Sequence, residues 1–230
     1  MINHQAFVDQ EQSIYQKSFA KGTTLLEQQG IKPSSALVDS QSGYLVAVRH
    51  PPAIVDRVAA FSQRVASVVP AIVYDDKNMH ATVATYQIDK GIRAPDSGVL
   101  RAICQQLTPF SSQRPLIMYG TPTAHNWYAN SDTVIVGGSP ALSFTDLIDR
   151  VTTPSSDQSS LVLKPTWGSH ITAARFTEAR SSDQVKDLVA LLKEAPIVGE
   201  SQVTSLDVGF FTFTKDGFTY TVHDRFFFKQ

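Results

Sequence analysis

Residues 79–86 read Met-His-Ala-Thr-Val-Ala-Thr-Tyr, and residues 169–176 read Ser-His-Ile-Thr-Ala-Ala-Arg-Phe. In each segment a histidine is followed two residues later by a threonine, among small, β-branched and aromatic residues that are typical of a buried strand. Because side chains alternate between the two faces of a strand, His80 and Thr82 share one face, as do His170 and Thr172. Brought together, these four groups can move protons and hold an anionic oxygen without a metal.

The composition is that of an ordinary folded protein, with 42% hydrophobic and 18% charged residues in a chain of 230. This length is enough for one large domain or two small lobes with a real core. The formal net charge of −1 argues against a protein that holds long nucleic acid through many phosphates. A small anionic ligand is compatible with this charge, and we expect the protein to be a monomer.

A single cysteine, Cys104, excludes an intramolecular disulfide and a zinc site built from several cysteines. The sequence begins without a charged-then-apolar leader, and no apolar run approaches the length of a membrane-spanning helix. We therefore expect no signal peptide, no membrane span and a cytoplasmic location.

The first part of the chain is interpreted as a helical extension. Phe7 and Leu25 belong to an apolar set at roughly helical spacing, and Gly30 is suited to end a helix. We expect residues 1–42 to pack on a main domain formed by residues 43–230 and to carry no chemistry of their own.

The remaining elements follow a similar order in the two halves of the chain: a helix, an extended segment, a His-x-Thr strand, another helix and further strand. The two histidines are 170 − 80 = 90 residues apart, which suits a duplicated unit. This pattern predicts an α+β fold with antiparallel sheets flanked by helices. Helices are expected to begin near residues 52, 97, 143 and 181, and strands are expected at 44–48, 71–74, 116–119, 133–136, 204–214 and 218–228, the last two joined as a hairpin at 215–217.

From Gly43 to Phe228 the sequence resembles the 2H phosphoesterase superfamily, whose bacterial branch is named for 2′-5′ RNA ligase and RNA 2′,3′-cyclic phosphodiesterase activity. The resemblance includes the strand 44–48 with its proline-led helix, the two His-x-Thr segments and the closing aromatic hairpin. It implies two similar lobes around a central cleft. The sequence departs from the family pattern at Ser169, where many relatives carry proline, at Ala173, where leucine is usual, and in the segment before Gly43.

The resemblance implies that His80, Thr82, His170 and Thr172 form the active site of a cyclic phosphodiesterase. Opening a cyclic phosphodiester requires a base that activates water and an acid that protonates the leaving oxygen, and histidine can serve as either near neutral pH. The two threonines would donate hydrogen bonds to the non-bridging oxygens, where negative charge accumulates. Which histidine is the acid stays open at this point.

The expected substrate is a small nucleotide or short RNA that carries a 2′,3′-cyclic phosphate, or a 2′-5′ linkage. Two alternatives remain open from the sequence. The first is a binding module with the same fold that holds a nucleotide or RNA end without turnover, and the second is RNA 2′-5′ ligation through the same site. No cofactor is expected.

Three further residues are weaker candidates for substrate binding. On a regular strand Arg175 would face away from His170, where it would make a structural ion pair instead of touching the ligand. Trp167 and Tyr119 would stack on a base if they are exposed, and pack in the core or at the rim otherwise. No metal is expected, because a His/His site needs a third ligand.

Overall fold

The computed structural model describes residues 2–19, 22–107, 114–120, 126–153 and 161–228. The helices are α1 (His4–Ile14), the π-helical turn η1 (Tyr15–Phe19), α2 (Gly22–Gln29), α3 (Ser35–Val38), α4 (Pro52–Val68), α5 (Ser97–Gln106), α6 (Leu142–Thr152), the 3₁₀ turn η2 (Ser182–Val185) and α7 (Lys186–Lys193). The strands are β1 (Ser42–Arg49), β2 (Ala71–Val73), β3 (Ala81–Asp89), β4 (Leu116–Tyr119), β5 (Trp127–Ala129), β6 (Thr133–Val136), β7 (Ser139–Pro140), β8 (Lys164–Pro165), β9 (Ile171–Phe176), β10 (Gly199–Gln202), β11 (Ser205–Thr214) and β12 (Gly217–Phe227).

The main sheet runs in the order β12-β11-β1-β3-β9-β6-β5, with β2 also paired to β9 and β8 to β3. A smaller sheet has the order β10-β4-β7. Every strand pair in both sheets is antiparallel. The predicted α+β class with antiparallel sheets is therefore confirmed.

The two His-x-Thr strands meet at the middle of the main sheet, where Ala81 of β3 pairs with Ile171 of β9. Beyond this point the two strands separate, and each takes a different partner. β3 pairs with β8, which leads into β9, while β9 pairs with β2, which leads into β3. This reciprocal exchange gives the two halves similar connectivity around the meeting point.

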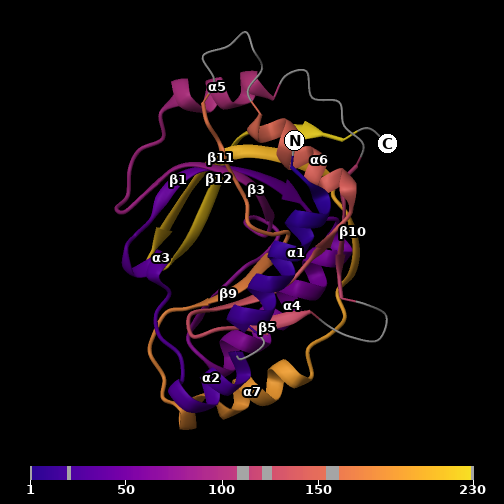
Figure 1. The fold of residues 1–230 in the computed structure, drawn as a ribbon. Helices are drawn as coiled ribbons and strands as arrows, with labels where there is room; N and C mark the ends of the chain where they lie inside the picture. The colour runs from indigo at the N-terminus through magenta and orange to yellow at the C-terminus, as the bar shows by residue number, and fades with distance from the viewer. Residues whose placement is uncertain (1, 20–21, 108–113, 121–125, 154–160, 229–230) are drawn as a thin grey trace.

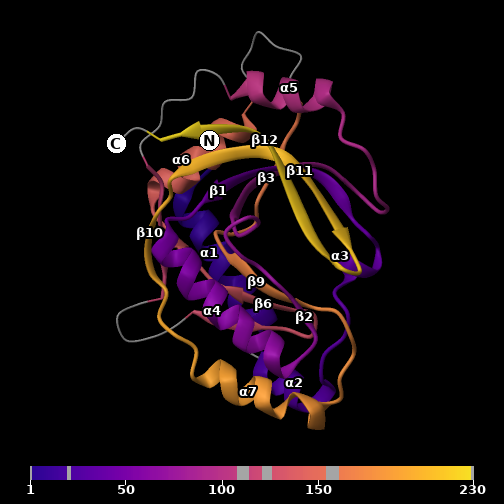
Figure 2. The ribbon, with the colours of Figure 1, turned by 180° about the vertical axis from the view of Figure 1, so that it is seen from behind.

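The sheet is thereby divided into two lobes, as predicted. Figures 1 and 2 show β1, β3, β11 and β12 in one lobe, with α5 and α6 against it, and β2, β5, β6 and β9 in the other. The helices α2 and α7 lie at the far end of the second lobe (Figure 1).

α4 covers the second lobe, and its sequence explains why it forms there. Pro52 occupies the first turn, where a proline costs no intrahelical hydrogen bond. Val58, Phe61 and Val65 recur at helical spacing and are buried, so that one stripe of the helix packs towards β2 and β9. Burial of this apolar stripe provides most of the stability of the contact.

The predicted boundaries need small corrections. α5 begins at Ser97, as expected, and Asp96 caps it, because its side chain accepts hydrogen bonds from the backbone N–H groups of Gly98 and Val99. Ser143 does not cap α6, which begins one residue earlier at Leu142; its hydroxyl instead accepts a hydrogen bond from the N–H of Leu116. The short strands β5, β7, β8 and β10 were not predicted, since two to four residues leave too little pattern to recognise.

Candidate functional site

A pocket of about 480 Å³ lies where β3 and β9 meet, beneath the β11–β12 hairpin. The four residues expected to form the active site, His80, Thr82, His170 and Thr172, all line it. The complete lining consists of Ser35, Ala36, Gln41, Leu45, Tyr74, His80, Thr82, Thr85, Ile88, Lys164, Pro165, Thr166, Trp167, His170, Thr172, Arg175, Phe211, Phe213 and Phe218.

The register of the two strands explains how the four groups come together. Ala81 and Ile171 form the pair, and both side chains are fully buried on the core side. Continuing an antiparallel register by one residue in each direction places His80 beside Thr172 and Thr82 beside His170 on the pocket side. The two histidines are then diagonal neighbours, about 7–8 Å apart and somewhat closer at their Cβ atoms.

Each histidine lies one residue before its strand begins, but the two imidazoles are held differently. Nδ1 of His80 lies 2.6 Å from the carbonyl oxygen of Asn78. A carbonyl can only accept, so this nitrogen carries the hydrogen and donates it. Nδ1 of His170 is buried and has no hydrogen-bond partner among the described residues. The backbone thus fixes the proton position of His80, and leaves the ring of His170 to be oriented by packing.

Burial lowers the pKa of both imidazoles. The pKa of His80 falls to about 4, chiefly through burial, opposed by the hydrogen bond to Asn78 and lowered further by Arg49 and Arg175. The pKa of His170 falls to about 3 through burial, with added repulsion from Arg175 and from His80. Both rings are therefore neutral at pH 7 in the free protein, and a bound anion would favour protonation of one of them.

Arg175 lies in the pocket, contrary to the expectation for a regular strand. The register of β6 against β9 shifts between Val134, which pairs with Ala174, and Ile135, which pairs with Thr172. The extra residue, Ala173, forms a β-bulge that rotates the following side chains to the opposite face. Arg175 thus lies on the same side as Thr172, and this corrects the prediction that it faces away.

A matching bulge occurs in β3. The register of β1 against β3 shifts between Val46, which pairs with Ala84, and Ala47, which pairs with Thr82. Thr85 is thereby brought into the pocket at the position equivalent to Arg175. Thr85 was not among the predicted site residues, because the bulge that turns it into the pocket is visible only in the register of β3 against β1.

Arg175 is held by three groups around its guanidinium. Nε donates to the hydroxyl of Tyr74 at 3.0 Å, and Nη1 donates to the hydroxyl of Ser34 at 3.2 Å. The guanidinium carbon lies 4.9 Å from the centroid of the Phe213 ring, within range for a cation–π interaction. These contacts are to neutral groups, so the positive charge remains available to an anion in the pocket.

The two aromatic candidates differ. Trp167 lines the pocket and stacks on the imidazole of His170, with ring centroids 4.2 Å apart and planes inclined by 20°. Tyr119 is fully buried, and its hydroxyl donates to the carbonyl oxygen of Ser169 at 2.9 Å. It has no exposed face for a base, so Tyr119 follows the other alternative left by the sequence, packing in the core.

An apolar wall faces the two histidines. Phe211, Phe213 and Phe218 from the β11–β12 hairpin line the pocket, and the ring centroid of Phe218 is 5.7 Å from that of His80. The sequence showed these residues as part of an aromatic hairpin, but contained no sign that they face the histidines.

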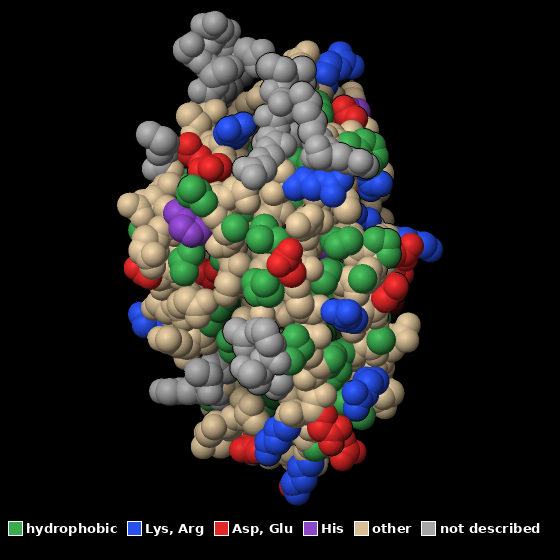
Figure 3. Space-filling model, turned by 90° about the vertical axis from the view of Figure 1, so that its right-hand side faces the viewer, with side chains coloured by type: hydrophobic (Ala, Val, Ile, Leu, Met, Phe, Trp, Pro, Cys, Tyr) green, Lys and Arg blue, Asp and Glu red, His purple; other side chains and the backbone are tan. Residues whose placement is uncertain are grey.

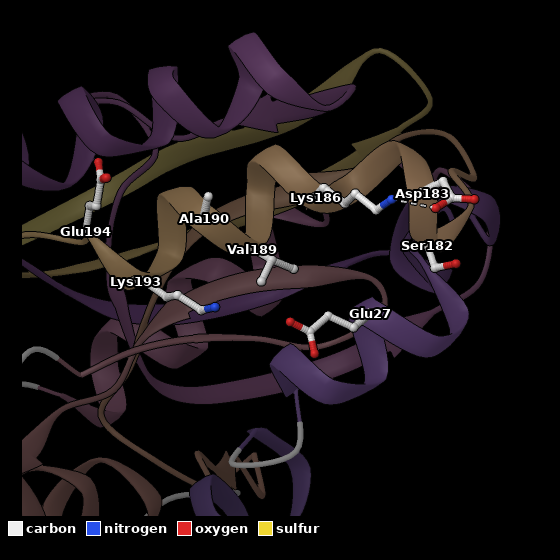
Figure 4. Close-up of a pocket in the computed structure, with 8 residues that line it drawn as sticks. All are labelled: Glu27, Ser182, Asp183, Lys186, Val189, Ala190, Lys193 and Glu194. Carbon is white, nitrogen blue, oxygen red and sulfur yellow. Dashed lines mark ion pairs between the residues drawn. The ribbon is translucent and has the colours of Figure 1, made fainter.

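A second pocket, of about 570 Å³, lies between α2 and α7 at the far end of the molecule (Figure 4). Its lining includes Glu27 and Lys193, whose side chains face each other across the groove, and an exposed ion pair of 2.8 Å between Lys186 and Asp183. It lacks a histidine, and its charges are those of an ordinary solvated surface.

Two features are absent from the described residues. No group of three His, Cys, Asp or Glu side chains there is placed to hold a metal ion. None of the helices in this part of the chain combines the length and apolar character needed to cross a membrane.

Comparison with solved structures identifies proteins of the same fold. TT0787 of Thermus thermophilus aligns with a TM-score of 0.51 and 14% identity, over 80% of this chain and 97% of that one. E. coli LigT complexed with phosphate gives 0.51 and 15%, over 83% and 99%. The Agrobacterium tumefaciens protein ATU0111 gives 0.50 and 13%, over 86% and 97%. No protein-family model and no curated protein matches the sequence. The expected resemblance is therefore confirmed at the level of the fold.

Proposed function

We propose that this protein is a metal-independent phosphoesterase that opens a 2′,3′-cyclic phosphate in a nucleotide or short RNA. The observation that supports this most directly is the pairing of β3 with β9, which gathers two imidazoles and two threonine hydroxyls on one side of a single pocket. LigT, which shares the fold, has been solved with phosphate, with ATP and with 3′-AMP. A nucleotide phosphate is the ligand class that fits both findings.

The reaction adds water across one P–O bond of the cyclic diester. One imidazole removes a proton from water as its oxygen attacks phosphorus, and the other donates a proton to the 3′ oxygen as it leaves, so that a 2′-phosphate remains. The hydrogen bond from His80 to Asn78 favours the protonated form of that ring. We therefore assign His80 as the acid and His170 as the base.

Three groups would hold the non-bridging oxygens. Thr82 and Thr172 can each donate a hydroxyl hydrogen bond, and Arg175 adds a full positive charge on the same side of the pocket. Hydrogen bonds to an anion whose charge grows in the transition state accelerate the chemical step.

The pocket favours a small or short substrate. The phenylalanines of the β11–β12 hairpin offer a flat apolar wall for a nucleoside beside the phosphate position. Acidic and basic side chains are interspersed over the face shown in Figure 3, and the net charge is −1. A long duplex would require a continuous positive surface.

The lowered pKa values of both histidines favour a second candidate, a module that binds nucleotide ends without turnover. A neutral His80, whose Nδ1 hydrogen is donated to Asn78, can accept a hydrogen bond from a protonated phosphate oxygen, and neither neutral ring has to transfer a proton to hold the ligand. RNA 2′-5′ ligation, the reverse of cleavage, would use the same groups.

A substrate panel separates these possibilities. In excess EDTA, 2′,3′-cyclic nucleotides are expected to be hydrolysed to 2′-phosphates at the same rate as without EDTA, while 3′,5′-cyclic nucleotides are not. Product identity would be followed by ³¹P NMR. The panel also contains 2′-5′-linked dinucleotides, whose cleavage would point to a ligase-type specificity.

Two results would contradict the proposal. If EDTA abolishes turnover and a divalent cation restores it, the mechanism is not metal-independent. If no member of the panel is turned over but 2′-phosphates bind, and bind less well to variants of the pocket threonines, the protein is a binding module.

The pH dependence follows from the lowered pKa values. Because protonated imidazole is lost above a pKa of about 4, kcat/KM is expected to fall about tenfold per pH unit between pH 5 and pH 8. In the complex the anionic substrate raises the pKa of the acid, so kcat should change less over this range. Rates would be measured at each pH with circular dichroism as a check of folding. An optimum of kcat/KM at pH 7–8 would contradict this assignment.

A further inference from the structure

The N-terminal helix α1 reaches the second histidine segment through Glu11. Oε1 of Glu11 accepts a hydrogen bond of 2.5 Å from the backbone N–H of Ser169 and one of 2.8 Å from the hydroxyl of Ser169. Ser169 immediately precedes His170. Glu11 is 158 residues away in sequence from the residue that it holds, and its side chain is completely buried.

The residues around Glu11 accommodate its carboxylate through a hydrogen bond and through the space left by a glycine. Tyr15 donates its hydroxyl to Oε1 at 3.0 Å and accepts the N–H of Gly138 at 3.0 Å. A Cβ atom at Gly168 would lie 2.9 Å from Oε1, so glycine at this position leaves room for the close approach.

Burial of Glu11 at this position is unfavourable in free energy. Its Oε2 has no hydrogen-bond partner among the described residues, and no ion pair compensates its charge there. Burial raises its pKa, opposed by the hydrogen bonds from Ser169 and Tyr15. A buried carboxyl group without a cation destabilises a fold compared with an apolar residue of similar size. Packing alone therefore does not explain Glu11.

Glu11 lies next to His170, the histidine whose ring is not held by a hydrogen bond to the backbone in the described residues. The ring of His80 is held by the carbonyl of Asn78, whereas Nδ1 of His170 has no partner in the described residues. The position of His170 depends instead on the backbone at Ser169 and on stacking against Trp167. The hydrogen bonds of Glu11 and Tyr15 support both the Ser169 backbone and Trp167, because Tyr15 contacts Trp167 edge to face, with ring centroids 5.9 Å apart.

We propose that Glu11 is a positioning residue, which holds His170 at the phosphate site through Ser169 and makes the N-terminal helix a working part of that site. This inference rests on the proposed function. It revises the expectation that residues 1–42 carry no chemistry. The same segment also contributes Ser34, whose hydroxyl accepts the hydrogen bond from Arg175.

The test compares Glu11→Leu with Glu11→Gln. Leucine is similar in size but cannot accept the hydrogen bonds of Ser169, so kcat is expected to fall about 10- to 100-fold with little change in KM. Glutamine keeps an acceptor oxygen and is expected to retain activity within about fivefold of the wild type. Ser169→Ala removes only the hydroxyl bond, and is expected to lower kcat by a smaller factor.

Two variants of the same helix control for stability and charge. Asp9→Asn removes an exposed carboxylate and is expected to change nothing. Phe7→Leu weakens the packing of α1 but removes none of the hydrogen bonds of Glu11, and is expected to lower the melting temperature but leave kcat unchanged at temperatures where the protein is folded. If Phe7→Leu lowers kcat as much as Glu11→Leu, the role of Glu11 is structural only.

A second readout is independent of turnover. The imidazole signals of His80 and His170 would be followed by NMR with inorganic phosphate as the probe. In Glu11→Leu, the His170 signals are expected to shift and to respond less to phosphate, while the His80 signals stay as in the wild type. Unchanged His170 signals would overturn the inference. If the His170 signals change in Glu11→Leu but the wild-type protein hydrolyses none of the substrates, the proposed function is wrong and the positioning role of Glu11 is kept.

If Glu11→Leu does not fold, Ser169→Ala decides the question by the same two measurements. Wild-type kcat and wild-type His170 signals in a folded Ser169→Ala protein would overturn the inference. Selective disturbance of His170 would support it.

Discussion

Replacing His170 with alanine is expected to reduce kcat for a 2′,3′-cyclic nucleotide by about 10²- to 10⁴-fold, and replacing His80 is expected to cause a loss in the same range. The two rings line one pocket, and His80 lowers the pKa of His170, so the two are close enough to act on the same phosphorus. Neither loss should alter the melting temperature greatly, because both side chains are half-buried at the pocket and neither belongs to the apolar core.

The rates of His80→Ala and His170→Ala should differ from each other on a substrate with a better leaving group. In a nitrophenyl phosphodiester the leaving group is nitrophenolate. This ion is stable without a proton, so it departs without help from an acid. With this substrate the loss in His80→Ala should shrink to within about tenfold of wild type, while the loss in His170→Ala persists. Initial rates of both variants on both substrates would show this. The opposite pattern would exchange the roles of acid and base.

A suitable control is His223→Ala, since His223 is exposed on β12 and does not line the pocket. It should keep wild-type rates on both substrates. If the double variant His80→Ala/His170→Ala retained wild-type turnover, the chemistry would have to take place elsewhere in the protein.

Replacing Asp207 with alanine is expected to lower the free energy of unfolding by about 3–5 kcal/mol. The carboxylate of Asp207 is fully buried and accepts two hydrogen bonds from Arg225, at 2.7 and 2.8 Å. It also lies 3.5 Å from Nε of Arg49, whose side chain is only 12% exposed. Without Asp207 the buried positive charge of Arg49 would lose the carboxylate with which it forms an ion pair.

Denaturant unfolding at pH 7 would measure this loss, which corresponds to a decrease in melting temperature on the order of 10 °C for a chain of this size. Asp216→Asn is the matched control, because Asp216 lies exposed in the turn of the same hairpin and should change stability by less than about 0.5 kcal/mol. A loss below about 1 kcal/mol in Asp207→Ala would show that the arginines find other partners.

The effect should extend to the first histidine. Arg49 donates to the carbonyl of Met79 at 3.0 Å and to that of Asp76 at 2.7 Å, which fixes the turn before His80. The folded fraction of Asp207→Ala is therefore expected to show a lower kcat than wild type. Restoring stability with an osmolyte should not restore this part of the loss.

Local patterns in the sequence were enough to predict many of the elements. The proline before α4, the aspartate before α5 and the turn between β11 and β12 act within a few residues of where they stand in the chain. The alternation in the two His-x-Thr segments likewise depends only on neighbouring residues, so it identified two strands and the side that each histidine shares with its threonine.

Arg175 and Thr85 show where this reasoning stops. Side chains alternate between the two faces of a strand, so a residue an even number of positions from a histidine is expected to share its face. One bulge adds a residue and reverses the faces of all residues after it. A bulge is defined by two residues opposing one on the partner strand, so β1 and β6 decide it and not the strand alone. The pattern within β9 therefore predicted the wrong face for Arg175.

The α+β class, the two histidine strands and the residue types that the chemistry needs could all be predicted from the sequence, because they follow from local periodicity and from side-chain pKa. The folded chain was needed to show that the strands meet at Ala81 and Ile171, that Tyr119 is buried, and that Glu11 lies against Ser169. A glutamate on a helix is expected to face water. The contact that buries this one joins residues 158 positions apart, and no local pattern encodes such a pairing.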